Sequence, residues 1–297
     1  MTLRPCAGPV DLPAILDLLI ECEAAGYVDM ELRSIELRIW LANNAHHLSS
    51  WTAIAEVGSK TLGFGLLWGG HTLGLLVHPS ARRQLEPRLI DWAAGRAHAQ
   101  GIDRLGALCR DDDTVGLEVL RSLGFATVET ELRMTRELDT PIPEPSVPDG
   151  FNIRPLALPH ELDEWLALYA ATIGDRPHIL SKWRAYRADS DYDNALDLVA
   201  VDSAGRLAGA CTCTVASLET NRLPALEGRT EPVMVRADCQ GRGLGTALVV
   251  SGLHALRHCG LRTAALTTEA DNQRAHKLYA ALGYRTRYRA LWMDRPC

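Results

Sequence analysis

The sequence lacks several features that would assign it to a special class of protein. No apolar run is long enough to span a membrane, and the chain does not open with a basic segment followed by an apolar stretch. The eight cysteines include no CxxC pair, and the histidines show no spacing typical of metal ligands. We therefore expect a protein of the reducing cytoplasm, with no membrane anchor and no metal or redox framework.

Positive charge is also scarce. The 31 Lys and Arg residues are outnumbered by 37 Asp and Glu residues, which gives a net charge of −6. This balance argues against nucleic acid as a partner and is weakly compatible with a cationic amine. With 47% hydrophobic and 23% charged residues, the composition is that of an ordinary globular protein. The length of 297 residues predicts about two domains.

The most informative segment is a glycine-rich turn between a strand pattern and a helix pattern. The apolar run Pro232–Val235 precedes the turn, and a helix-like run follows it. Glycine lets the backbone approach a ligand closely, and the free N–H groups of a first helical turn attract an anion. The pattern predicts a site for a phosphate or pyrophosphate. The residues expected to hold it are Gln240, Gly241, Arg242, Gly243, Leu244, Gly245 and Thr246.

A glycine-rich turn alone does not identify the ligand. A Walker loop requires Gly-Lys-Ser/Thr at its end, which this turn lacks. A dinucleotide-binding fingerprint needs an acidic residue about 20 positions further on, and Glu269 leaves that interpretation open. The following residues favour another one. Leu261–Thr268 has the pattern of a strand, a helix follows from Asp271 to Tyr279, and Gly283 is placed to end it.

Two segments together resemble the GNAT superfamily of acetyltransferases. The turn Gln240-x-x-Gly243-x-Gly245 is similar to the acetyl-CoA pyrophosphate loop of that family. The segment Ala270–Tyr284 is similar to its second coenzyme motif, with Asn272, Ala275 and Tyr279 on one helix face. The resemblance implies an α+β fold with a mixed, mostly antiparallel sheet flanked by helices. It also implies an acyltransferase with acetyl-CoA as co-substrate and a small-molecule amine as acceptor.

The resemblance also implies roles for individual residues. Val233, Met234 and Val235 would hold the pantetheine arm by backbone pairing, and the amide of Val233 or Met234 would polarise the thioester carbonyl. Asn272 and Ala275 would contact the coenzyme. Tyr279 would be both a coenzyme contact and the general acid that protonates the leaving thiolate, since a phenol is protonated at neutral pH.

Other interpretations of these residues stay open. Tyr279 could be a core aromatic residue of an amphipathic helix, and Asn272 could be a helix cap. Glu231 is the candidate general base, acting through a water, but it could equally be a solvated carboxylate at the strand edge. Many family members place a base two residues earlier, where this chain has Arg229. The identity of the base is therefore open at this point.

The same order of elements occurs twice along the chain. A segment with four prolines, Asp139–Gly150, cannot hold a regular helix and reads as a semi-rigid linker. On either side of it we predict a strand, two helices, a hairpin, and then strand, helix, strand and helix. The helix that follows the strand Leu73–Val77 is predicted over Glu86–Gln100, and the second hairpin strand of the second copy over Leu207–Val215. We therefore expect two tandem GNAT-like domains, over residues 1–138 and 151–297.

The first copy lacks the phosphate-binding turn. Aligning Val77 with Val235 places Leu85, Glu86 and Pro87 at the positions of Gly243, Leu244 and Gly245. A side chain, a negative charge and a missing N–H each disfavour a phosphate there. Aligning Gly124 with Gly283 puts Asp113 and Leu120 at the positions of Asn272 and Tyr279. We expect this domain to be folded but unable to bind acetyl-CoA productively, serving to shape the substrate cleft or a homodimer interface.

The acceptor is the least defined part of the prediction. By resemblance, its pocket would be built from the first two helices of the second domain and the segment Glu219–Gly228. The candidates are Trp165, Tyr169, Asp175, His178, Trp183 and Tyr186, most of which could equally be core residues. A different class of function also stays open, namely a non-catalytic acetyl-CoA sensor or regulatory module.

Overall fold

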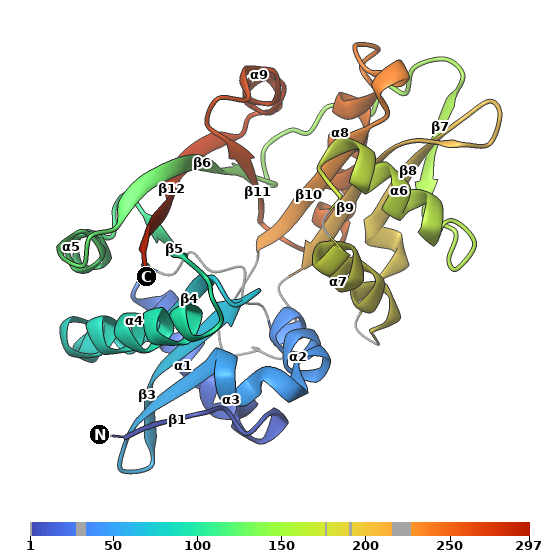
Figure 1. Ribbon diagram of the computed structural model, residues 1–297. Coiled ribbons are helices and arrows are strands. Elements are labelled where there is room, and N and C mark those ends of the chain that lie inside the picture. Colours follow the sequence, from blue (N-terminus) through green and yellow to red (C-terminus); the bar gives the residue numbers. More distant parts are fainter. Residues whose placement is uncertain (1, 28–33, 176, 190–191, 216–226) are drawn as a thin grey trace. The chain divides into compact units, whose positions relative to one another are not determined.

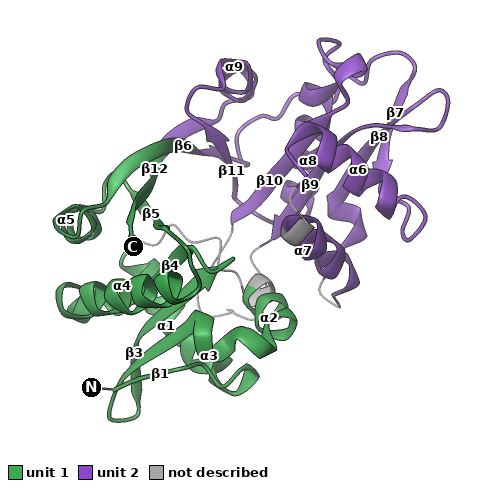
Figure 2. Ribbon diagram, in the orientation of Figure 1, with its two compact units in different colours: residues 1–132, 288–297 green, residues 133–287 purple. Residues whose placement is uncertain are grey.

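The chain forms two compact units (Figures 1 and 2). The computed structural model describes residues 2–27, 34–175, 177–189, 192–215 and 227–297. Unit 1 comprises residues 1–132 and 288–297, and unit 2 comprises residues 133–287. The chain passes between the units twice, once within strand β6 (Ala126–Glu137) and once within strand β12 (Arg285–Pro296). The proline-rich segment 139–150 contains no helix or strand.

Unit 1 is a sheet with helices on both faces. Its strands lie in the order β1-β2-β3-β4-β5, followed by residues 288–296 of β12. All neighbouring pairs in β1–β5 and the β5–β12 pair are antiparallel except β4–β5, which is parallel. The strands are β1 (Thr2–Arg4), β2 (Thr52–Val57), β3 (Lys60–Trp68), β4 (Thr72–Val77) and β5 (Arg104–Arg110). The helices are α1 (Leu12–Ala24), α2 (Ser34–Asn43), α3 (Leu48–Trp51), α4 (Arg82–Ala99) and α5 (Thr114–Ser122), with 3-10 turns η1 (Pro9–Asp11), η2 (Ala45–His47) and η3 (Pro79–Ala81).

The alternation of side chains along β2–β4 explains why helices cover both faces of unit 1. Ile54 and Phe64 are buried in one cluster with Ile15 and Leu18 of α1. Ala53 and Ala55, one residue out of step with Ile54, lie in a second cluster with Leu85 and Leu89 of α4. Successive residues of a strand point to opposite faces, so each face is apolar and each needs a helix.

Unit 2 repeats this architecture. Its strands lie in the order β6-β11-β10-β9-β8-β7, of which β10–β11 is a parallel pair, whereas β9 pairs antiparallel with both β8 and β10 and β7 pairs antiparallel with β8. Helix α6 packs on β9 and β10, and α8 packs on β8, β9 and β10. The remaining strands are β7 (Phe151–Pro155), β8 (Asp197–Asp202), β9 (Leu207–Val215), β10 (Glu227–Val235) and β11 (Thr263–Glu269). The helices are α6 (Leu162–Thr172), α7 (Pro177–Ala188), α8 (Leu244–His258) and α9 (Gln273–Ala281), with 3-10 turns η4 (Asn194–Leu196) and η6 (Ala237–Cys239).

Small residues let α8 lie close to the sheet of unit 2. A Cβ at Gly252 of α8 would lie 2.8 Å from Sγ of Cys213, and a Cβ at Gly209 of β9 would lie 2.8 Å from Leu248. On the other face, Ala210 and Met234 belong to a cluster with Trp165 of α6. The core of unit 2 therefore lies on both sides of β9 and β10, the two strands that lead to the predicted site.

The observed elements match the predicted mixed sheet flanked by helices, but three features differ. The short helix α3 was not predicted. Helix α4 begins at Arg82, whereas the sequence predicts a start at Glu86. Pro87 therefore lies inside the helix and not in its first turn. Strands β6 and β12 were not predicted. None of the described helices is long and apolar enough to cross a membrane.

Candidate active site

The centre of the site is the end of strand β10, where its two neighbours behave differently. Strand β9 stays paired with β10 as far as Val235, with a register shift between Thr230 and Val233. The parallel pairing with β11 covers Glu227–Arg229 against Thr263–Ala265. Successive amides of a strand point to alternate edges, so one of Val233 and Met234 directs its N–H away from β9. The edge that faces β11 can therefore accept an added extended chain.

Glu231 joins β10 to β11 at the point where the two strands separate. Its Oε2 accepts the amide N–H of Thr267 at 2.6 Å, and its Oε1 accepts Nη1 of Arg229 at 3.0 Å. Nη1 of Arg133, on β6, lies 3.7 Å from the same Oε1. The carboxylate is half-buried at the base of the predicted acyl site and has defined partners on both oxygens. It is therefore not simply a solvated group at a strand edge.

The glycine turn leads into α8 with its amides exposed. Gly241 and Gly243 have φ of +76° and +88°, a region that favours glycine. Gly243 is the N-cap of α8, and no side chain caps the helix. The first N–H groups of α8 therefore lack the acceptor that a Ser, Thr, Asp or Asn cap would supply. An uncapped helix start with its positive dipole end is suited to a diphosphate.

The side chains around the turn do not all point at it. Arg242 lies over the ring of Phe151, 4.6 Å from its centroid, and donates to the carbonyl oxygen of Asp149 at 3.4 Å. Gln240 donates to the carbonyl oxygen of Val235 at 3.0 Å and accepts Nη1 of Arg274 at 2.8 Å. Arg274, on α9, thus reaches the turn. The predicted phosphate contact of Arg242 stays a prediction.

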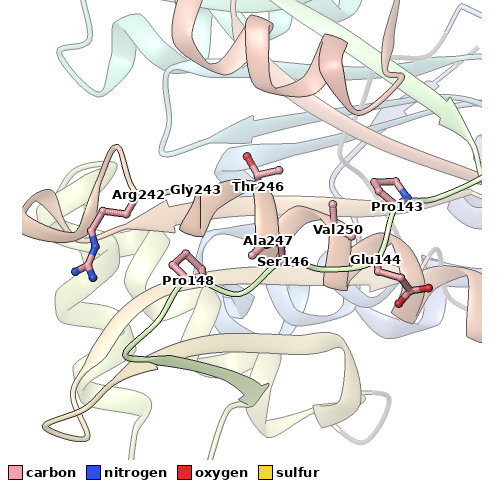
Figure 3. A pocket seen from close by; sticks show the side chains of 9 residues that line it. All are labelled: Pro143, Glu144, Ser146, Pro148, Arg242, Gly243, Thr246, Ala247 and Val250. Carbon is pink, nitrogen blue, oxygen red and sulfur yellow. The ribbon is translucent and has the colours of Figure 1, made fainter.

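A shallow cavity of about 430 Å³ flanks the start of α8 (Figure 3). It lies between the first turns of the helix and the proline-rich segment that runs beside it. The carbonyl oxygen of Pro143, in that segment, lies 2.9 Å from Nε2 of His254 of α8, within hydrogen-bond distance. The lining residues are Pro143, Glu144, Ser146, Pro148, Arg242, Gly243, Thr246, Ala247 and Val250.

Tyr279 lies on α9, half-buried, close to β10. Burial raises the pKa of its phenol above the ordinary value of about 10, and the nearby Cys211 and Glu231 add to this shift. The phenol is therefore protonated at neutral pH, as a general acid must be. Its ring packs against that of Tyr284 with centroids 5.7 Å apart.

The other residues of the second motif have clear local roles. Oδ1 of Asn272 accepts the amide N–H of Ala275 at 3.1 Å, so Asn272 is the N-cap of α9. The cap interpretation is thus confirmed, and a contact of Asn272 or Ala275 with the coenzyme stays a prediction. Within the described residues, no group of three or more His, Cys, Asp or Glu is arranged to hold a metal ion.

Part of the predicted acceptor pocket is core. Trp165 is fully buried, and the guanidinium of Arg187 lies 3.7 Å from the centroid of its ring. Arg187 in turn forms a buried ion pair with Asp197 at 2.8 Å. This cluster anchors α6 and α7 to β8. The pattern of aromatic residues in the sequence alone could not distinguish such a core cluster from a set of residues that surround a ligand. Residues 219–226 of the predicted pocket segment, and the side chain of His178, lie outside what the structure describes.

In unit 1 the corresponding place is filled by the chain's own side chains. Arg82, at the position of Gln240, donates to both oxygens of Asp113, at 2.7 and 2.6 Å, and also to Glu86. Its guanidinium lies 3.8 Å from the ring centroid of Tyr27, whose hydroxyl donates to the carbonyl oxygen of Val77. Burial raises the pKa of Glu86, although Arg82 opposes this. The predicted phosphate turn is here the first turn of α4.

Comparisons with known proteins agree with this geometry. The model of the acetyltransferase (GNAT) family matches residues 161–284. The mycothiol acetyltransferase of Arthrobacter sp. is 32% identical over 235 residues, which cover 77% of this chain and 71% of that protein. The enzyme of the same name from Pseudarthrobacter chlorophenolicus is 33% identical over 71% of this chain and 66% of its own length. The one from Salinispora arenicola is 29% identical over 93% of this chain and 91% of its own length.

Solved structures show the same fold in both halves of the chain. A tandem GNAT protein from the clavulanic acid biosynthesis pathway has a TM-score of 0.77 at 18% identity, covering 99% of this chain and 98% of its own. A GCN5-related N-acetyltransferase from Sphaerobacter thermophilus has a TM-score of 0.73 at 21% identity, covering 99% and 95%. The predicted fold class, two tandem GNAT-like domains, is confirmed.

Proposed function

We propose a specific activity for this protein. The chain belongs to the GNAT acetyltransferase family and is an N-acetyltransferase with acetyl-CoA as co-substrate. It transfers the acetyl group directly to the primary amine of a small molecule, with Tyr279 as general acid. Only the second copy of the fold is active, so that residues 1–138 form a degenerate domain and residues 151–297 the coenzyme-binding one. A homodimer stays a prediction.

One observation carries this proposal: three features that acetyl transfer requires meet at the end of β10. The edge of Val233–Val235 that faces β11 accepts the pantetheine arm, and the uncapped start of α8 accepts the diphosphate. The half-buried phenol of Tyr279 supplies a proton. Acetyl-CoA brings the activated acetyl group, and the residues present fit it.

The proton movements follow from the chemistry of aminolysis. The neutral amine attacks the thioester carbonyl, which the amide of Val233 or Met234 polarises. The carbon–sulfur bond breaks, and Tyr279 donates its proton to the departing thiolate. Glu231 of β10, which hydrogen bonds to the amide of Thr267 on β11 and to Arg229 hold in place, accepts the proton of the new ammonium group through a water. Glu231→Gln should then lower kcat with little change in KM for acetyl-CoA; an unchanged kcat rules this base out.

The restriction to unit 2 rests on the contrast between the two copies. In unit 1 a buried arginine and two buried carboxylates occupy the place of the turn, and Leu120 stands where Tyr279 stands. A second diphosphate there would have to displace a buried ion pair and meet two negative charges. The first unit therefore has neither the coenzyme site nor the acid.

Release of the free thiol from acetyl-CoA, measured against a panel of primary amines, tests the activity. The panel includes the acceptor of the mycothiol acetyltransferases, because relatives of that name match this chain. The account predicts turnover of at least one amine and a loss of about 100-fold or more in kcat for Tyr279→Phe, with little change in KM for acetyl-CoA. Tight coenzyme binding without turnover of any amine would instead indicate a sensor or regulatory module.

A further inference from the structure

We propose that Tyr284 and Thr230 form a lock that positions Tyr279 against β10. The inference rests on the proposed role of Tyr279 as general acid. Tyr284 is not assigned any contact with substrate, and it acts through its neighbour. The lock consists of one turn of backbone, one ring contact and one buried hydrogen bond, each of which the structure shows separately.

The turn that ends α9 brings Tyr284 back onto Tyr279. The amide of Tyr284 donates to the carbonyl oxygen of Tyr279 at 3.0 Å, and the amide of Gly283 donates to the carbonyl oxygen of Ala280 at 3.0 Å. Gly283 has a φ of +86°. These are the two hydrogen bonds of a Schellman motif, in which the residue after the glycine packs on the first residue of the last turn. Here those two residues are Tyr284 and Tyr279, with an interplanar angle of 62° between their rings.

The hydroxyl of Tyr284 ties this pair to the central strand. It shares a 2.7 Å hydrogen bond with Oγ1 of Thr230, and both residues are buried, with exposed fractions of 3% and 0%. Thr230 is the residue at which the register of β10 against β9 shifts. The amides of Val233 and Met234 lie just beyond this shift. A single buried hydrogen bond thus connects the helix of the acid to the strand of the thioester donor.

Unit 1 provides an internal comparison, because it keeps the turn and lacks both hydroxyls. The amide of Phe125 donates to the carbonyl oxygen of Leu120 at 3.1 Å, and the amide of Gly124, with φ +85°, donates to that of Arg121 at 3.0 Å. Leu120 and Phe125 of unit 1 therefore occupy the positions that correspond to Tyr279 and Tyr284 of unit 2. Phe125 is buried as Tyr284 is. The fold of the turn thus needs no hydroxyl at either position, and the anchoring hydroxyl occurs only in the copy that carries the acid.

Three nearly isosteric variants of the full-length enzyme test the lock. Tyr284→Phe and Thr230→Val each remove one hydroxyl and keep the packing, whereas Thr230→Ser keeps the hydroxyl. We expect Tyr284→Phe and Thr230→Val each to lower kcat about tenfold or more, because a small displacement of a catalytic group is costly. The double variant should be no slower than the slower single one, because both remove the same bond. Thr230→Ser should retain kcat, and KM for acetyl-CoA should change less than about twofold throughout.

Tyr27→Phe is the matched control, because it removes a partly buried tyrosine hydroxyl that donates a hydrogen bond to the carbonyl oxygen of Val77 in unit 1. It should lower the melting temperature about as much as Tyr284→Phe and leave kcat unchanged. Full kcat in Tyr284→Phe, or multiplicative losses in the double variant, would overturn the lock while Tyr279→Phe stays slow. If Tyr279→Phe also keeps its kcat, the failure lies in the proposed acid. Equal losses of kcat in Tyr27→Phe and Tyr284→Phe would reduce the effect to stability and likewise overturn the lock.

Discussion

Arg82 and Asp113 form a bidentate ion pair in unit 1, with Nη1–Oδ1 and Nη2–Oδ2 distances of 2.7 and 2.6 Å. The pair joins the first turn of α4 to the N-cap of α5. At the corresponding place in unit 2, Gln240 accepts one exposed hydrogen bond from Arg274. A coenzyme phosphate can replace that exposed bond at little cost, whereas the buried ion pair resists replacement.

The ion pair leads to a prediction about stability. Arg82→Gln should lower the free energy of unfolding by about 3–5 kcal/mol, since it leaves the buried carboxylates of Asp113 and Glu86 without their cation. Denaturant unfolding of the full chain measures this. The double variant Arg82→Gln/Asp113→Asn should lose less, because Asn can still cap α5 at Gly116 without a buried charge. A loss below about 1 kcal/mol for the single variant would contradict a structural role for the pair.

Gly245 distinguishes a glycine kept for a ligand from one kept for the fold. It is not among the glycines with positive φ, and a Cβ there would make ordinary contacts of 3.6 Å with Leu278 and Val235. Gly245→Ala should therefore fold with unchanged or slightly higher stability, since Ala is favoured over Gly in a helix by up to about 1 kcal/mol. The added methyl lies between β10 and α9, so Kd for acetyl-CoA should rise at least tenfold.

Gly252→Ala is the control for this prediction, because its Cβ would lie 2.8 Å from Sγ of Cys213 and force the helix off the sheet. That variant should lose stability first and affinity only as a consequence. Thermal unfolding and calorimetric titration of both variants separate the two effects. Equal affinity of wild type and Gly245→Ala would place the coenzyme elsewhere.

The pH dependence of turnover reports on Tyr279. Burial raises the pKa of its phenol above the ordinary value of about 10, so the acid form persists through the whole neutral and mildly alkaline range. An acid must be protonated to act, and a raised pKa moves the loss of activity to higher pH. We therefore expect kcat to show no decline between about pH 8 and pH 10 that is attributable to this residue. A decline centred below about pH 9 that disappears in Tyr279→Phe would contradict the assignment.

Sequence reasoning worked best where the pattern is local. The bounds of β9, Leu207–Val215, follow from an apolar run behind the turn at Gly205, and they are as predicted. Strands β6 and β12 were missed because their alternation is irregular and arginines interrupt it. What makes β12 a strand is its antiparallel pairing with β5, more than 180 residues earlier, which no local pattern contains.

The site shows the same division. The glycine turn and Tyr279 were recognised from a motif, whereas Tyr284 and Thr230 were not, because their contact depends on the register shift in β10. The predicted start of α4 at Glu86 was wrong, because it assumed a turn in unit 1 at the positions of the glycine turn of unit 2. The buried pairing of Arg82 allows a helix to begin there instead. Trp165 could not be separated from a pocket residue until Arg187 was seen against its ring.

Calorimetric titration of the full-length protein with acetyl-CoA tests the central claim most directly. The account predicts one binding site per chain, with a stoichiometry that stays at one in Arg82→Gln and an affinity that collapses when Gly243 and Gly245 are both replaced by alanine. Two binding sites per chain, or one site whose affinity for acetyl-CoA does not change when those two glycines are replaced, would contradict a single coenzyme site at the glycine turn of unit 2.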